Sequence, residues 1–113
     1  MSQITTHVLD TATGKPASGI PVMLEARTGP DHWERVAQGE TDNDGRIPGF
    51  VLPDRVLPPG TYRMRFETAT YFQRTNVQGF YPWVEVVFDL RDSSHYHVPL
   101  LLSPYGYSTY RGS

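Results

Sequence analysis

Short stretches of the chain alternate between apolar and polar residues with a period of two, and proline or glycine separates them. In GTYRMRFET (60–68), Tyr62, Met64 and Phe66 point to one side, and the charged residues between them point to the other. This alternation is typical of a strand with one buried face. We expect strands at about residues 4–10, 20–28, 33–40, 46–50, 60–68, 82–90, 95–103 and 105–110.

Turns and one helix complete the predicted pattern. Ten proline and ten glycine residues punctuate the chain, and turns are indicated at TGKPASG (13–19) and DNDG (42–45), among others. A helical period fits only ETATYFQRTNV (67–77), where Tyr71, Phe72 and Thr75 approximate an i, i+3/i+4 stripe. The pattern predicts an all-β fold, either a two-sheet sandwich or a barrel, with one short helix. A length of 113 residues suits a single domain over 1–113.

The segment HYHVPLLLS (95–103) differs from the other strands because both of its faces carry apolar residues. One face holds Tyr96, Val98, Leu100 and Leu102, and the opposite face holds His95, His97, Pro99 and Leu101. If the first face is core, Pro99 and Leu101 lie outside beside a histidine, which indicates an interface or a ligand groove. Proline cannot donate to a strand ladder, so a bulge or local edge is expected near Pro99.

Charge and composition exclude several classes of partner. The formal net charge is -2, from ten Lys+Arg and twelve Asp+Glu, with no run of like charge, so we expect neither nucleic acid nor an anionic membrane as a partner. No stretch of eighteen apolar residues occurs, and MSQITTHVLD does not resemble a signal peptide. We therefore expect a cytoplasmic protein. The chain has no cysteine, which excludes disulfides and thiolate sites.

Two histidines are candidates for chemistry. His7 shares the outward face of the first strand with Leu9, and His97 lies on the outward face of its own strand. A single strand histidine is usually structural, but two on outward faces suit a site, because a neutral imidazole can activate water near pH 7. Metal binding is the weaker interpretation, since no chelating motif such as H-E-x-x-H is present. His32 and His95 are interpreted as surface histidines.

Arg46 follows the acidic stretch TDNDGR (41–46). This stretch resembles the opening of a calcium loop, but the later acidic ligands are missing, so we expect a hairpin turn and no metal. Arg46 is then either a solvated side chain or a fixed fork for a planar ligand. Composition and periodicity thus lead to a β-sandwich with a histidine-lined groove, and they do not define a reaction.

Four segments together resemble the transthyretin-related family, and in particular its enzyme branch, the 5-hydroxyisourate hydrolases. The segments are HVLDTATGKPASGIPV (7–22), TDNDGR (41–46), TYFQRTNVQGFYPWVEVVF (70–88) and HYHVPLLLSPYGYSTYRGS (95–113). The terminal YRGS is the most specific of these motifs, because hormone-carrying transthyretins resemble LLSPYGYST but diverge after it and lack the two histidines. The resemblance implies a transthyretin-like sandwich of two four-stranded sheets.

The resemblance also implies an activity and an assembly. The activity is hydrolysis of a ring amide in 5-hydroxyisourate, a product of urate oxidation, to 2-oxo-4-hydroxy-4-carboxy-5-ureidoimidazoline, without a cofactor. The assembly is a homotetramer, a dimer of dimers with its sites at the dimer–dimer interface. The residues implied as catalytic are His7, Arg46 and His97. Those implied to bind substrate are His7, Arg46, Tyr110, Arg111, Gly112 and Ser113.

The sequence leaves the general base unassigned and allows two alternative functions. Which of His7 and His97 is the general base is not defined by the pattern. A carrier that holds an aromatic ligand in the same channel is a second hypothesis, against which the two histidines and the intact YRGS argue. A purely structural sandwich is a third, and it predicts a monomer.

Overall fold

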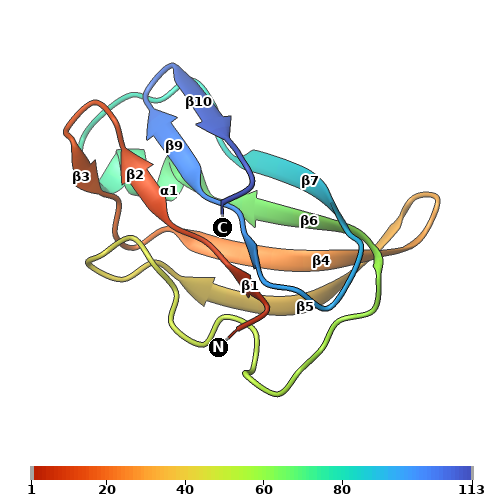
Figure 1. The fold of residues 1–113 in the computed structure, drawn as a ribbon. Coiled ribbons are helices and arrows are strands. Elements are labelled where there is room, and N and C mark those ends of the chain that lie inside the picture. The colour runs from red at the N-terminus through yellow and green to blue at the C-terminus, as the bar shows by residue number, and fades with distance from the viewer. Residues whose placement is uncertain (1, 113) are drawn as a thin grey trace.

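The computed structural model describes residues 2–112, and within them two four-stranded sheets pack face to face (Figure 1). The elements are β1 (Ile4–Thr5), β2 (Val8–Asp10), β3 (Lys15–Pro16), β4 (Pro21–Gly29), β5 (His32–Glu40), β6 (Gly60–Phe66), α1 (Thr68–Arg74), β7 (Val84–Leu90), β8 (Tyr96–His97), β9 (Leu100–Ser103) and β10 (Gly106–Thr109). One sheet has the strand order β10-β9-β2-β3 and the other β5-β4-β6-β7, while β1 and β8 pair separately. The predicted all-β sandwich with one short helix is confirmed.

The sheet β5-β4-β6-β7 is antiparallel throughout, and its central strand β6 follows the predicted alternation. Tyr62, Met64 and Phe66 are buried in the core, whereas Arg63 points outward. On the outer face the Arg63 guanidinium lies 2.8 Å from the carboxylate of Glu25 on β4. The inner face of this sheet therefore supplies one half of the hydrophobic core.

The sheet β10-β9-β2-β3 supplies the other half of the core and presents an apolar outer face. Strands β2 and β9 run parallel, with Leu9 opposite Leu101, and β10 places Ser108 opposite Leu101. Val8 and Leu100 are fully buried in the core, while Leu9 and Leu101 are only partly covered. The predicted outward position of Leu9 and Leu101 is confirmed.

The helix α1 lies behind β2 and β3 in Figure 1 and is tied to β2 by a buried hydrogen bond. Its Tyr71 hydroxyl donates to Asp10 Oδ2 at 2.7 Å, and Asp10 Oδ1 accepts the amide N–H groups of Ala12 and Thr13. Burial and this bond raise the pKa of Tyr71 to about 12. Within residues 2–112, no helix is long and apolar enough to cross a membrane.

Four of the predicted segments differ from the structure. The strand predicted at 46–50 is absent: only Arg46 pairs, in an isolated bridge, and residues 48–50 turn away. Pro48 cannot donate to a ladder and Gly49 has φ 67°. Strand β3 lies inside the segment predicted as a turn at 13–19, where Lys15 pairs with Asp10. Each of the predicted strands 4–10 and 95–103 is broken into two.

The break in the C-terminal strand falls at residues 98–99, where the irregularity near Pro99 was expected. The break also changes which residues are buried. Because the alternation is lost there, Val98 and Pro99 are both buried, and Pro99 does not lie on the outer face as predicted. The Thr109 hydroxyl donates to the Pro99 carbonyl at 2.7 Å and holds the end of β10 against this break.

Candidate active site

His7 and Arg46 are brought together by an isolated antiparallel bridge between the N-terminal strand and the 42–46 turn. The amide of Val8 donates to the Gly45 carbonyl at 2.9 Å, and the carbonyl of His7 accepts the Leu100 amide at 2.9 Å. His7 is therefore fixed on both sides, by the turn and by the start of β9. Two residues 39 positions apart in the chain become neighbours in this way.

The turn that carries Arg46 is organised by Asp42. Its Oδ1 accepts the amide N–H groups of Asp44 at 2.8 Å and Arg46 at 3.0 Å, and its backbone amide donates to the Arg46 carbonyl at 2.8 Å. The predicted turn is present, but it does not join two paired strands, because β5 pairs with β4 and Arg46 pairs only with His7. No group of three or more potential metal-binding side chains occurs in residues 2–112. The backbone of Arg46 is held while its side chain is exposed.

Gly45 allows the turn to approach His7 closely. It has φ 74°, a conformation that favours glycine. A Cβ at Gly45 would also lie 2.4 Å from the Val8 carbonyl oxygen and 3.2 Å from Cδ2 of His7. Conformation and space both require glycine at this position.

His97 is held between the N-terminal strand and the C-terminal tail. Its Cα partner in the parallel β1–β8 pair is Thr5, and on the other side it forms an isolated bridge with Gly112. The Gly112 amide donates to the His97 carbonyl at 2.7 Å. The ordered tail thus returns to the histidine, which accounts for the strand-like pattern near the end of the sequence.

Arg46 and His97 line the same hollow. Its wall is formed by Ser2, Thr5, Thr6, Arg46, Ile47, Pro48, Gly49, His95 and His97. The loop 46–49 forms one side of the wall, and polar residues of the N-terminal segment with the two histidines form the other, so a small planar molecule could lie against the loop and meet an imidazole. Two of the three predicted catalytic residues, Arg46 and His97, therefore share one cavity, whereas His7 is not among the residues that line it.

The electrostatics of this hollow keep His97 uncharged. Burial lowers the pKa of the His97 imidazole, and the charge of Arg46 together with those of His95 and His7 lowers it further. A neutral imidazole at pH 7 is a proton acceptor. The guanidinium charge of Arg46 favours an anionic or electron-rich ligand in the same hollow.

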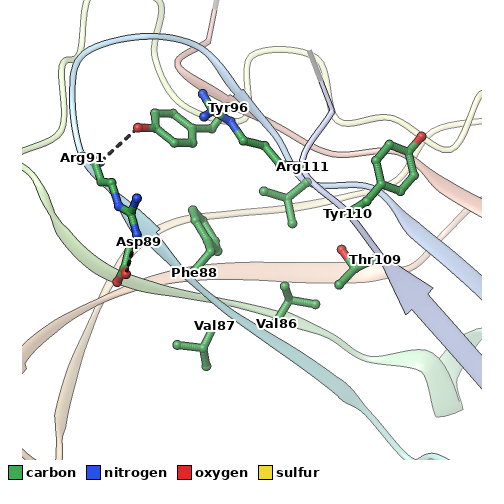
Figure 2. A pocket seen from close by; sticks show the side chains of 10 residues that line it. Val86, Val87, Phe88, Asp89, Arg91, Tyr96, Thr109, Tyr110 and Arg111 are labelled. Carbon is green, nitrogen blue, oxygen red and sulfur yellow. Dashed lines mark hydrogen bonds and ion pairs between the residues drawn. The ribbon is translucent and has the colours of Figure 1, made fainter.

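Tyr110 and Arg111 line a different hollow, between β7 and the C-terminal tail (Figure 2). The Arg111 guanidinium lies 4.1 Å from the centre of the Tyr96 ring, and its Nη2 is 3.5 Å from the His95 carbonyl oxygen. This hollow contains neither His7 nor His97, so within one chain the two tail residues stand apart from the histidines. Ser113, the last predicted site residue, lies outside the described residues.

Two residues in contact with His97 were missed as candidates. The Thr5 hydroxyl lies 2.8 Å from Nδ1 of His97 and 2.9 Å from Nε2 of His95. His95 is partly buried and lines the hollow, so its interpretation as a surface histidine is wrong. The available signal was the spacing of His95 and His97, which puts both side chains on one face of a strand.

Comparison with known proteins identifies the family. Residues 4–112 match the HIUase/Transthyretin family. A 5-hydroxyisourate hydrolase of Mus musculus is 46% identical over 99% of this chain and 96% of its own length. The solved 5-hydroxyisourate hydrolase of Klebsiella pneumoniae superposes with a TM-score of 0.85 at 36% identity, over 99% of this chain and all of that one. Transthyretin from Sparus aurata superposes with a TM-score of 0.91 at 31% identity, over 99% and 97% of the two chains.

The fold and the site define a transthyretin-like sandwich with a histidine-lined hollow. The chain belongs to the HIUase/Transthyretin family. The resemblance predicted from the four sequence segments is confirmed, because the mouse and Klebsiella relatives are hydrolases of this family.

Proposed function

We propose that this chain hydrolyses 5-hydroxyisourate to 2-oxo-4-hydroxy-4-carboxy-5-ureidoimidazoline in urate degradation. One observation carries the proposal: a partly buried imidazole, His97, lines the same hollow as Arg46 and has a pKa below its ordinary value. The similarity to the mouse and Klebsiella hydrolases supports the choice of substrate. The reaction needs neither a cofactor nor a metal.

The chemistry follows from the resistance of a ring amide to water. Attack on the carbonyl carbon forms a C–O bond and places negative charge on the carbonyl oxygen, so water must lose a proton and the oxyanion must be stabilised. Neutral His97 takes the proton from water, and the Arg46 guanidinium faces the developing charge. The ring C–N bond then breaks, and the departing nitrogen takes the proton that His97 removed from water, which returns His97 to its neutral form. His7, fixed beside Arg46, orients this step.

The remaining predicted site residues form the wall of the pocket in the assembled protein. Gly112 packs on His97, and the hollow lined by Tyr110 and Arg111 is adjacent through Tyr96. We infer a homotetramer, a dimer of dimers, in which Tyr110, Arg111 and Ser113 complete sites at the dimer–dimer interface. The partly covered outer face of the β10-β9-β2-β3 sheet supports this assembly. A cytoplasmic location stays a prediction of the sequence.

The test generates 5-hydroxyisourate in place with urate oxidase and follows its ultraviolet absorbance. We expect the signal to decay faster with this protein than in buffer. The His97→Asn variant should lower the catalysed rate by roughly 10²- to 10⁴-fold, the usual effect of losing a general base. Decay at the buffer rate with folded wild-type protein would refute the hydrolase and leave a ligand carrier as the better hypothesis.

A further inference from the structure

The contact between Thr5 and two imidazoles is not used by the mechanism above. Thr5 Oγ1 lies between His97 Nδ1 at 2.8 Å and His95 Nε2 at 2.9 Å. The two rings are nearly parallel, with an interplanar angle of 22° and centres 6.5 Å apart. One hydroxyl therefore joins the proposed base to a second titratable ring.

The backbone fixes this arrangement. Thr5 and His97 are Cα partners in the parallel β1–β8 pair, and His95 precedes His97 by two residues, so the three side chains share one face. The Tyr96 amide donates to the Gln3 carbonyl at 2.8 Å and the Val98 amide to the Thr5 carbonyl at 2.9 Å. Register, and not side-chain flexibility, places the hydroxyl between the rings.

The single proton of the Thr5 hydroxyl limits the hydrogen bonds that it can donate. A threonine hydroxyl has one proton to donate, so it can donate to only one of the two ring nitrogens. When both contacts are hydrogen bonds, the other nitrogen must carry a proton and donate to the hydroxyl oxygen. The tautomers of His95 and His97 are consequently linked: the proton position on one ring sets that on the other.

The other ring nitrogen of His97, Nε2, faces solvent. Within residues 2–112, Nε2 of His97 forms no hydrogen bond with another group, and no buried side-chain nitrogen or oxygen lacks a partner. A buried Nε2 would be such an unpartnered atom, so Nε2 must be accessible to solvent. Nδ1, in contrast, contacts the Thr5 hydroxyl. If His97 accepts a proton from water, the accepting lone pair is on Nε2, and Nδ1 must then carry the ring proton.

We propose that Thr5 and His95 are positioning residues for His97: Nδ1–H of His97 donates to the Thr5 hydroxyl, which donates to Nε2 of His95. This chain keeps Nε2 of His97 as the lone-pair acceptor. When Nε2 takes the proton of the attacking water, the Nδ1–H bond to Thr5 stabilises the imidazolium. The inference rests on the proposed function, because it takes His97 as the base.

Paired variants separate this role from a structural one. Thr5→Val removes the hydroxyl at nearly constant shape, and Thr5→Ser restores it. His95→Phe removes the accepting nitrogen, whereas His95→Gln retains an acceptor without a titratable ring. We expect Thr5→Val and His95→Phe to lower kcat about tenfold or more with KM within about twofold, and Thr5→Ser and His95→Gln to stay within about threefold of wild type.

The tautomer itself is measured by NMR of full-length protein labelled with ¹⁵N-histidine at pH 8, with His97 signals assigned from the His97→Asn spectrum. We expect the Nδ1-protonated form in wild type and Thr5→Ser, and a shift toward the Nε2-protonated form in Thr5→Val and His95→Phe. An unchanged tautomer, or an unchanged kcat, in both removing variants would overturn the proposal. Wild-type protein without hydrolase activity would refute the proposed function, while the tautomer would still report on the hydrogen-bonded chain.

Discussion

Gly112 packs directly against the imidazole of His97. A Cβ at Gly112 would lie 2.6 Å from Cδ2 and 3.2 Å from Cγ of the ring, while the Gly112 amide donates to the His97 carbonyl at 2.7 Å. The hydrogen bond fixes the tail, so the ring would have to move to admit a side chain. The penultimate position of the sequence thus determines where the proposed base lies.

The variant Gly112→Ala should therefore impair catalysis more than folding. Displacing His97 by a few tenths of an ångström to an ångström is expected to lower kcat by roughly 10- to 100-fold. The melting temperature should change little, because the tail is at the edge of the sandwich. The matched control is Gly60→Ala, where the nearest atom to the new Cβ is 4.0 Å away. Equal activity of the two variants would contradict the role given to Gly112.

A second prediction concerns the turn that carries Arg46. Asp42→Ala removes the carboxylate that accepts the amides of Asp44 and Arg46, whereas Asp42→Asn retains an acceptor oxygen. We expect Asp42→Ala to lower kcat/KM about tenfold or more through misplacement of Arg46, and Asp42→Asn to stay near wild type. Circular dichroism and the hydrolysis assay on both variants test this. Similar losses of kcat/KM in Asp42→Ala and Asp42→Asn would show that activity depends on the negative charge of Asp42 and not on its hydrogen bonds within the turn.

The pKa of His97 gives a prediction for the pH dependence of activity. Burial lowers this pKa, and Arg46, His95 and His7 add to the effect. The neutral, basic form of His97 therefore persists below the ordinary value of 6.5. We expect the acid limb of the kcat/KM profile to fall below pH 6.5. An acid limb at or above 6.5 would contradict His97 as the base.

The same pKa shift makes stability depend on pH. Below about pH 6.5 the unfolded chain binds a proton at His97 that the folded chain does not. The free energy of unfolding should therefore fall as pH drops from 6.5 through the lowered pKa. Urea denaturation at a series of pH values measures this, and His97→Asn should reduce the dependence in that window. The control separates His97 from carboxylates that titrate at lower pH.

A further prediction tests the helix attachment. Tyr71→Phe removes the hydroxyl that donates to buried Asp10 and leaves Oδ2 without this partner, at an expected cost of about 1–3 kcal/mol in unfolding free energy. Because the folded pKa of Tyr71 is about 12, the unfolded chain loses its tyrosine proton first, and wild-type stability should fall between about pH 10 and 12. The variant should lack that tyrosine contribution. Unchanged stability at pH 7 would contradict a stabilising role for the bond.

Local patterns in the sequence predicted the parts of the fold that depend on local packing. The alternation of Tyr62, Met64 and Phe66 was sufficient for β6, because one face of that strand is core and the other is charged. Strand β3 was not predicted, because it consists of two exposed residues, Lys15 and Pro16, and has no apolar face. The loss of alternation at 98–99 depends on how β8 passes into β9, and periodicity carries no information about it.

The sequence offers candidate residues for the site but not their contacts. His7 and His97 are candidates from their outward strand faces, and Arg46 joins them through the family resemblance. The isolated bridge of His7 with Arg46 joins segments that only the fold brings together. The role of Thr5 depends on the parallel register of β1 with β8, across more than 90 residues of chain. No local pattern encodes that register, so Thr5 could not be named from the sequence.

The last prediction concerns assembly through the outer face of the β10-β9-β2-β3 sheet. Leu9 and Leu101 are Cα partners there and are partly covered in a single chain, so a second copy would bury them together. Leu101→Glu would place like charges near one another in a symmetric interface and desolvate them.

We expect wild-type protein to sediment as a tetramer at micromolar concentration and Leu101→Glu as a smaller species with at least tenfold lower hydrolysis, as expected when a shared site is no longer assembled. Val77→Glu, at a 41% exposed position after α1, is the matched control and should leave both properties unchanged. A wild-type monomer would refute the shared site, and so would a Leu101→Glu variant that dissociates but retains full activity. A single chain would hold all the groups that the reaction needs if the monomeric wild type, or the dissociated Leu101→Glu variant, is fully active.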